Sequence, residues 1–191
     1  SMSGAAWTYT LDNSDADTTA LDAGDTPTDA FTITVTETDS GVTDTMTVTI
    51  TVTGADDAVD AGSDQTGGVT EDASTTTATG TVAATDADAD AAFTYAIGTA
   101  AGTYGTLSMS GAAWTYTIDN SAAATTALDA GDTPTDAFTI TVTETDSGVT
   151  DTMTVTITVT GADEAVDAGS DQTGGVNEDA STTTATGKVG A

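Results

Sequence analysis

Histidine and cysteine are absent from the sequence, and its 191 residues carry one basic side chain against 31 carboxylates. Without His or Cys, the usual ligand sets for zinc, haem and iron–sulfur clusters cannot be assembled. The Ser-His-Asp and Cys-His nucleophile systems are excluded for the same reason. A formal net charge of −30 at pH 7 repels phosphate, so we expect no nucleic-acid binding and no membrane insertion. The small partner that fits this composition is a hard cation.

Apolar residues make up 37% of the chain, and low hydrophobicity with high net charge ordinarily favours disorder. The pattern argues against disorder, because residues 138–143 and 153–160 alternate apolar side chains with Thr. This period of two is typical of strands with one buried and one exposed face. Further strands are expected near residues 68–70, 77–84, 92–98, 105–110 and 113–118, with one helical turn in 122–128.

Seven short strands in about 100 residues predict an all-β fold, an Ig-like or cadherin-like β-sandwich in tandem copies. The apolar positions of these strands predict a thin core. Its expected members are Phe93, Tyr95, Ile97, Leu107, Trp114, Tyr116, Ile118, Leu128, Phe138, Ile140, Val142, Met153, Val155, Ile157 and Val159.

An internal repeat organises the chain. Residues 1–84 recur as residues 108–191 with only seven differences, an offset of 107. This period is the size of a whole domain and exceeds the roughly 20–45 residues of a solenoid coil. With boundaries at the Gly-flanked acidic stretches after residues 54 and 161, residues 55–161 form one complete repeat. Residues 1–54 are then the C-terminal part of a preceding repeat, and 162–191 the N-terminal part of the following one.

The ordered motifs at residues 114–121, 128–132 and 136–143, followed by the Thr-rich strand that ends at Gly161, resemble the VCBS-type repeat. The resemblance covers the full 107-residue period. It implies a cadherin-like or Ig-like extender domain of a large bacterial RTX-type adhesin, located at the cell surface or outside the cell. Such domains depend on calcium. The sequence departs from the family at the junction, where Ala55-Asp56-Asp57-Ala58 replaces the usual Asn-Asp-x-Pro element.

Clusters of acidic residues are the candidate functional groups of this sequence. Calcium takes roughly six to eight oxygen ligands, and Asp86, Asp88 and Asp90 have a suitable alternating spacing. They do not form an EF-hand, since Ala91 and Ile97 occupy the sixth and twelfth positions. The cadherin-like arrangement implied by the resemblance brings a start-of-domain Glu, this turn and the linker acids to one end of the sandwich. Our candidate calcium ligands are Asp56, Asp57, Glu71, Asp86, Asp88, Asp90, Glu144 and Asp146, with Asp163 and Glu164 serving the next junction.

Other interpretations remain open at this stage. The acidic clusters also fit a merely solvated surface, and Asp119, Asn120, Asp129 and Asp132 fit turn or cap positions better than ligand positions. A structural extender whose partners are neighbouring repeats is the leading function. The alternatives are a subunit of an extracellular filament or sheath with lateral self-association, and a glycan- or ice-binding module. We do not expect an enzyme, because the acids lie in turns with no sign of a cleft.

Overall fold

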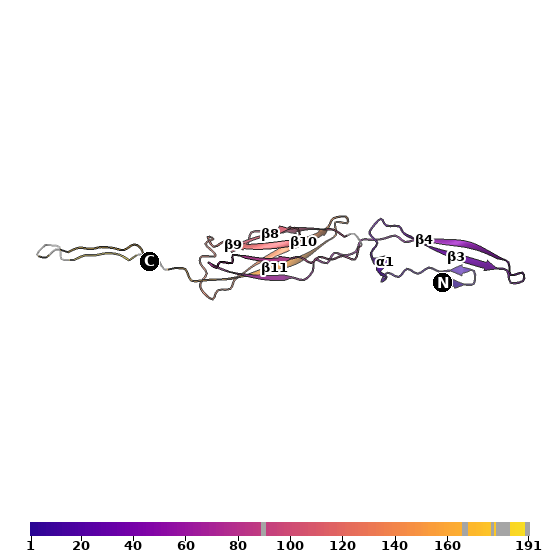
Figure 1. Cartoon of the computed structure of the whole chain (residues 1–191), viewed down its shortest axis with the longest axis horizontal. Helices are drawn as coiled ribbons and strands as arrows, with labels where there is room; N and C mark the ends of the chain where they lie inside the picture. The colour runs from indigo at the N-terminus through magenta and orange to yellow at the C-terminus, as the bar shows by residue number, and fades with distance from the viewer. Residues whose placement is uncertain (89–90, 166–167, 177, 179–183, 190–191) are drawn as a thin grey trace.

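The computed structural model describes residues 1–88, 91–165, 168–176, 178 and 184–189. The chain forms an elongated molecule with three parts in a row: an N-terminal part, a central sandwich and a C-terminal hairpin (Figure 1). The N-terminal part contains β1 (Met2–Ser3), β2 (Ala6–Trp7), α1 (Ala16–Thr19), β3 (Thr28–Thr36) and β4 (Thr43–Thr51). The central sandwich contains β5 (Gln65–Thr70), β6 (Thr77–Thr81), β7 (Phe93–Ile97), β8 (Gly105–Ser110), β9 (Ala113–Ile118), β10 (Thr135–Glu144) and β11 (Thr150–Thr160).

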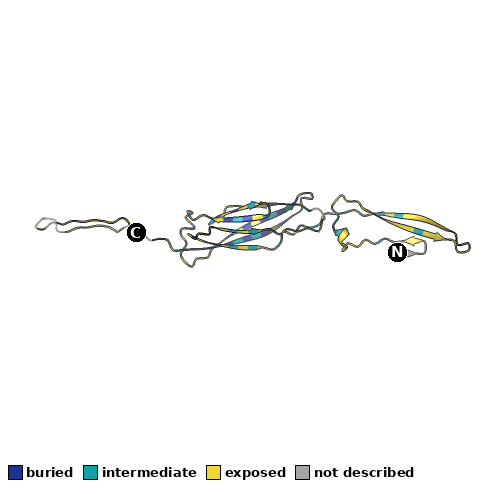
Figure 2. Ribbon diagram, viewed as in Figure 1, coloured by how far each residue is buried: buried dark blue, intermediate teal, exposed yellow. Residues whose placement is uncertain are grey.

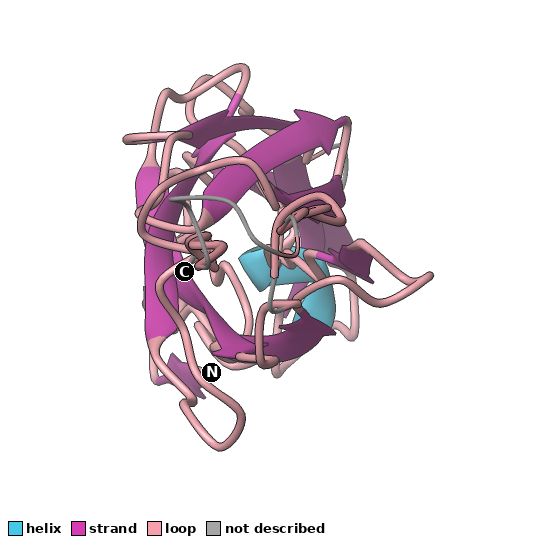
Figure 3. Ribbon diagram, turned by 90° about the vertical axis from the view of Figure 1, so that its left-hand side faces the viewer, coloured by secondary structure: helices cyan, strands magenta, loops and turns pink. Residues whose placement is uncertain are grey.

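Two sheets form the central sandwich, in the orders β5-β11-β10-β7 and β6-β9-β8. Neighbouring strands are antiparallel except β5 and β11, which pair in parallel from Val155 opposite Gln65 to Thr160 opposite Thr70. Seen end-on (Figure 3), the strands lie around the long axis of the molecule. All seven expected strands are present, and the fold is the predicted all-β, cadherin-like sandwich.

The core lies between these two sheets, because alternating side chains of every strand point inward. Twelve of the fifteen expected core residues are buried, and Trp114 and Tyr116 are among the least exposed. Phe93, Tyr95 and Ile97 are only partly buried, since β7 is an edge strand with one side uncovered. The core also includes four residues that the alternation did not identify, Val59, Ala61, Val69 and Val82.

The N-terminal part repeats half of this sandwich. β3 and β4 pair in the same register as β10 and β11, with Phe31 opposite Val48 as Phe138 is opposite Val155. Their side chains stay largely exposed, and the buried residues in Figure 2 are confined to the central sandwich. The inward face of this half-sandwich is therefore open.

The helical turn expected at 122–128 is a series of turns without an α-helix, whereas the first copy of the same stretch forms α1. The Asp15 side chain caps α1 by accepting a hydrogen bond from the Asp17 N–H. Ala122 replaces Asp15 in the second copy, so this cap is lost. An N-cap side chain is worth about 1 kcal/mol, enough to decide a one-turn helix.

Candidate metal centre at the repeat junction

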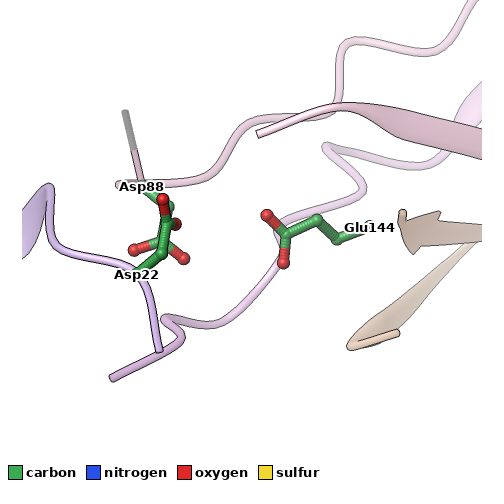
Figure 4. A group of neighbouring side chains, drawn as sticks. All are labelled: Asp22, Asp88 and Glu144. Carbon is green, nitrogen blue, oxygen red and sulfur yellow. The ribbon is translucent and has the colours of Figure 1, made fainter. Parts of the chain in front are cut away.

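Three carboxylates from distant parts of the chain meet where the N-terminal part joins the central sandwich. Asp22, Asp88 and Glu144 each bring a carboxylate oxygen within 4.8 Å of the others. Asp88 and Glu144 are buried, and Asp22 is half-buried. In Figure 4 the carboxylates of Asp88 and Glu144 point toward that of Asp22. The cluster therefore joins two successive repeats through side chains.

Local backbone structure positions each member of the cluster. Asp22 lies in a turn in which the Asp25 N–H donates to the Asp22 carbonyl over 3.0 Å. The Asp56 carboxylate holds this turn to the linker by accepting the Ala23 N–H over 2.9 Å. Glu144 is the last residue of β10, and its carboxylate accepts a hydrogen bond from the Ser147 hydroxyl.

Asp88 occupies the loop between β6 and β7, where an Asx turn fixes it. The Asp88 N–H donates to Oδ1 of Asp86 over 3.1 Å, and Asp88 Oδ2 accepts the Asp57 N–H over 3.0 Å. Burial raises the pKa of Asp88, and the negative charges of Asp86, Asp57 and Asp56 act in the same direction. The Asp57 N–H offsets part of this effect. The site thus concentrates negative charge that its own groups do not neutralise.

Two oxygens at this junction are buried without a hydrogen-bond partner, Oδ2 of Asp86 and Oδ1 of Asp88. A buried polar atom without a partner ordinarily costs about 1–3 kcal/mol. Hard carboxylate oxygens that converge from several segments are the donor set that calcium prefers. The residues therefore fit a calcium ion, with Asp22, Asp86, Asp88 and Glu144 as the groups that would hold it.

A second acidic group lies at the opposite end of the central sandwich. Glu71 follows β5, its N–H donates to the Thr160 carbonyl, and its Oε2 accepts the Ala162 N–H over 3.2 Å. Its other oxygen, Oε1, is buried without a partner. Partial desolvation raises the pKa of Glu164 although its side chain is exposed, and the nearby Asp72 and Glu71 carboxylates add to the shift. Asp72 has φ of 54°, a strained conformation of the kind found at functional sites.

The expectation that Glu71 meets Asp86 and Asp88 at one end of the sandwich is therefore wrong. Parallel pairing of β5 with β11 carries Glu71 to the end where the chain leaves the sandwich. There it lies with the linker residues that follow Gly161. Among these, Asp163 accepts the Ala130 N–H over 2.9 Å, which reproduces the contact of Asp56 with Ala23 one repeat earlier.

The other sequence-based candidates fall in several places. Asp56, Asp57, Asp86, Asp88 and Glu144 gather at the first junction, while Asp146 is exposed in the turn after β10. Asp90 lies outside the described residues. Sequence reasoning missed Asp22, and it assigned Asp129, the equivalent residue in the second copy, to a turn. The Leu-Asp-Ala-Gly-Asp motif, present in both copies, was the available signal.

Fold and junction together define a tandem β-sandwich repeat with acidic connections. Residues 55–161, more than half of the chain, match the family described as bacterial cadherin-like domain. The chain belongs to this family. Cadherin-like domains are extender or adhesion-type modules that generally bind calcium, are typically extracellular and are typically non-enzymatic. Within the described residues, none of the helices has the length and apolar character needed to cross a bilayer.

The search of solved structures also gives matches. The chain matches mouse clustered PcdhgC3 EC1-3 with 15% identity and a TM-score of 0.44, over 78% of this chain and 46% of that one. Zebrafish RET cadherin-like domains 1 to 4 match with 11% identity and a TM-score of 0.35, over 71% and 31%. An endo-fucoidan hydrolase of glycoside hydrolase family 107 matches with 18% identity and a TM-score of 0.33, over 75% and 19%. The chain thus spans less than half of each. No curated protein matches.

Proposed function

We propose that this chain is part of the extender region of a large bacterial surface or secreted adhesin, and that calcium rigidifies each junction between its repeats. The observation that carries the proposal is the cluster of Asp22 with Asp88 and Glu144, which draws carboxylates from both sides of one junction. Without a cation these charges repel one another and loosen the connection. A bound cation would reverse that repulsion and fix the angle between repeats.

The calcium affinity needed for this role is modest. Extracellular calcium modules bind with dissociation constants of roughly 10⁻⁴–10⁻³ M. A site held at about ten times its dissociation constant adds roughly 1.4 kcal/mol to folding stability. For a thin core with buried carboxylates, an increment of this size at each junction is a substantial part of the total.

Among the alternative functions, a glycan-binding module would need an exposed aromatic platform on which a sugar could stack. Trp114 and Tyr116, the pair considered for sugar stacking, are buried in the core and contact its other members. The extender proposal needs no such platform, because it requires only stiff connections and a soluble, acidic surface.

Thermal unfolding of the 191-residue chain in EDTA, in calcium and in magnesium at equal ionic strength tests the proposal. We expect calcium to raise the melting temperature by several degrees and magnesium to raise it much less. Asp22→Asn should reduce the calcium-specific increment, while Asp39→Asn, which removes one exposed charge, should leave it unchanged. Equal shifts with both ions would indicate screening of charge and contradict a calcium site.

A further inference from the structure

One edge of the central sandwich has free backbone groups. β7 is the last strand of the four-stranded sheet, and among the described residues no strand pairs with its outer side. The Gly98 N–H donates to the Thr139 carbonyl over 3.1 Å, and in an antiparallel ladder every second residue bonds in this way. The intervening residues of β7 therefore turn their N–H and carbonyl groups away from β10. These residues are Phe93, Tyr95 and Ile97.

The other three sheet edges have partners within the chain. Residues 100–102 cover the edge of β8, where the Leu107 N–H donates to the Ala100 carbonyl over 2.9 Å. On the opposite side of the sandwich, the Gln65 side chain in β5 donates to the Thr81 carbonyl in β6 over 2.7 Å and so joins the two sheets. Among the described residues, β7 has no comparable cover. Its sequence also lacks the charged residues and Pro by which edge strands usually prevent pairing.

The side chains at this edge are uncharged and incompletely covered. Phe93, Tyr95 and Ile97 pack against the core but stay partly exposed. Thr94 and Ala96 lie on the outward face of β7 and are exposed. The outward positions of the neighbouring strands β10 and β11 hold only Thr and Ala. On a chain with 31 carboxylates, this side of the sandwich is one that another acidic chain can approach closely.

We propose that β7 pairs with β7 of a second copy, so that their two four-stranded sheets form one continuous sheet across a two-fold axis. An edge strand with free N–H and carbonyl groups is a template for such pairing, and two identical strands form it through the same surface on both subunits. The main-chain hydrogen bonds supply affinity, and the apolar side chains supply specificity. The contact gives a defined surface to the lateral self-association that the sequence left open.

The distribution of charge around β7 selects the antiparallel orientation. Asp86 and Asp88 precede the strand, whereas residues 98–104, which follow it, contain no carboxylate. Antiparallel pairing places the acidic end of each strand beside the uncharged end of the other. Parallel pairing would bring the two acidic ends together, where like charges repel. A second copy of this chain therefore offers both an uncharged edge and a matching arrangement of charge.

The register that uses every free backbone group places the two-fold axis at Tyr95. Tyr95 then lies opposite the partner's Tyr95, and Phe93 lies opposite Ile97 of the partner subunit. These hydrogen-bonded pairs would exchange about six main-chain bonds. The half-exposed side chains of Phe93, Tyr95 and Ile97 would cover one another across the contact. On the outward face, Thr94 lies opposite Ala96 of the partner subunit.

The dimer should be weak and sensitive to salt. β7 has five residues, so its pairing buries much less than the roughly 1,600 Å² of a standard stable interface. Each copy carries a charge of −30, and the two charges repel at long range. Association should therefore strengthen with salt up to physiological ionic strength, where the Debye length is about 8 Å.

Sedimentation velocity of the 191-residue chain, at concentrations up to the millimolar range, tests the proposal in EDTA and in calcium. We expect a monomer–dimer equilibrium in both solutions, so this result does not depend on the proposed calcium site. Tyr95→Pro should weaken the dimer at least roughly tenfold, because it removes an N–H at the free edge. Tyr95→Ala is the matched control, since it removes the ring but keeps the N–H, and it should weaken the dimer less. A monomer at all concentrations, or equal weakening by both variants, would overturn the proposal.

Thermal unfolding of the single chain tests which backbone groups are free. The Thr94 N–H faces Thr143 in the ladder with β10, so Thr94→Pro should lower the melting temperature by removing a bond of the sandwich. Tyr95→Pro should lower it no more than Tyr95→Ala does. Equal losses in Thr94→Pro and Tyr95→Pro would show that Tyr95 has no free N–H and would overturn the proposal.

Cysteine trapping identifies the register, and the natural chain has no Cys to interfere. Thr94 and the partner's Ala96 should form a non-hydrogen-bonded pair with Cα atoms about 4.5 Å apart, within the range of a disulfide. A mixture of Thr94→Cys and Ala96→Cys chains should form the mixed disulfide dimer under mild oxidation. Thr94→Cys with Thr139→Cys, which is exposed on the central strand β10, should not. Preferential crosslinking of Thr94→Cys with itself would indicate a parallel register and contradict the proposal.

Discussion

The Tyr116 hydroxyl donates a 2.8 Å hydrogen bond to Oδ2 of Asp136 inside the central sandwich. The same carboxylate accepts the N–H groups of Thr103 and Tyr104 over 2.7 and 3.0 Å. Asp136 is buried, so these three donors compensate its desolvation and fasten the loop before β8 to β10. Burial raises the pKa of Tyr116, and the Asp136 carboxylate raises it further.

Tyr116→Phe should therefore lower the free energy of unfolding by about 1–3 kcal/mol, because it removes one hydrogen bond to a buried charged acceptor. Urea denaturation followed by circular dichroism measures the change. The repeat provides a matched control in Tyr9→Phe, which removes the equivalent 2.7 Å bond to Asp29 at an exposed position. In dilute solution this second variant should be close to neutral, and equal effects would contradict the role of burial.

The effect of Asp88→Asn on stability should be opposite in sign with and without calcium. In EDTA the variant should be more stable than the natural chain at pH 7, because it removes a buried charge that faces Asp86, Asp57 and Asp56 and keeps an oxygen to accept the Asp57 N–H. In millimolar calcium it should be less stable, since one candidate ligand loses its charge. Melting temperatures in the two solutions measure both effects, and a variant that is destabilised equally in each would contradict the prediction.

Gly80→Ala should destabilise the central sandwich by about 1–3 kcal/mol, because the added Cβ would lie 2.5 Å from the rigid Trp114 ring. Gly187→Ala makes the same change in the C-terminal hairpin, where the Cβ would meet only the flexible Gln172 amide. In dilute solution we expect little change in stability from Gly187→Ala. Chemical denaturation of both variants provides the comparison.

Acid stability should depend on Asp151. Its carboxylate accepts the Ala61 N–H over 2.9 Å, and this bond, with a second from the Thr152 N–H, lowers its pKa. A lowered carboxyl pKa contributes stability above its usual value, and this contribution is lost as the pH falls through the folded-state pKa. Asp151→Asn should therefore flatten the loss of stability between about pH 5 and about pH 2. Asp44→Asn, the same change in the first copy, should leave that slope unaltered.

Much of the fold could be predicted from the sequence, since alternation of apolar residues with Thr located β10 and β11, and the other five strands of the central sandwich were expected at or close to their observed positions. Val59 and Ala61 were not predicted as core residues because they lie outside any alternating run. The burial of Phe93 was overestimated, because the sequence does not show which strand lies at the edge of a sheet. The carboxylates that meet at the junction were harder to predict. Asp22 is 66 residues from Asp88 along the chain, and only the packing of one repeat on the next brings them together. Local pattern also gives no sign that β5 runs parallel to β11, and this direction decides where Glu71 lies.

Parallel pairing of the first and last strands of the central sandwich has a mechanical consequence. When an array is pulled from its two ends, the tension enters this sandwich before β5 and leaves it after β11. Because the two strands point the same way, the load pulls them along each other in opposite directions. The backbone hydrogen bonds between them are then sheared together and cannot be opened one at a time. Each sandwich should therefore resist stretching strongly, and under load the junctions on either side of it should yield first.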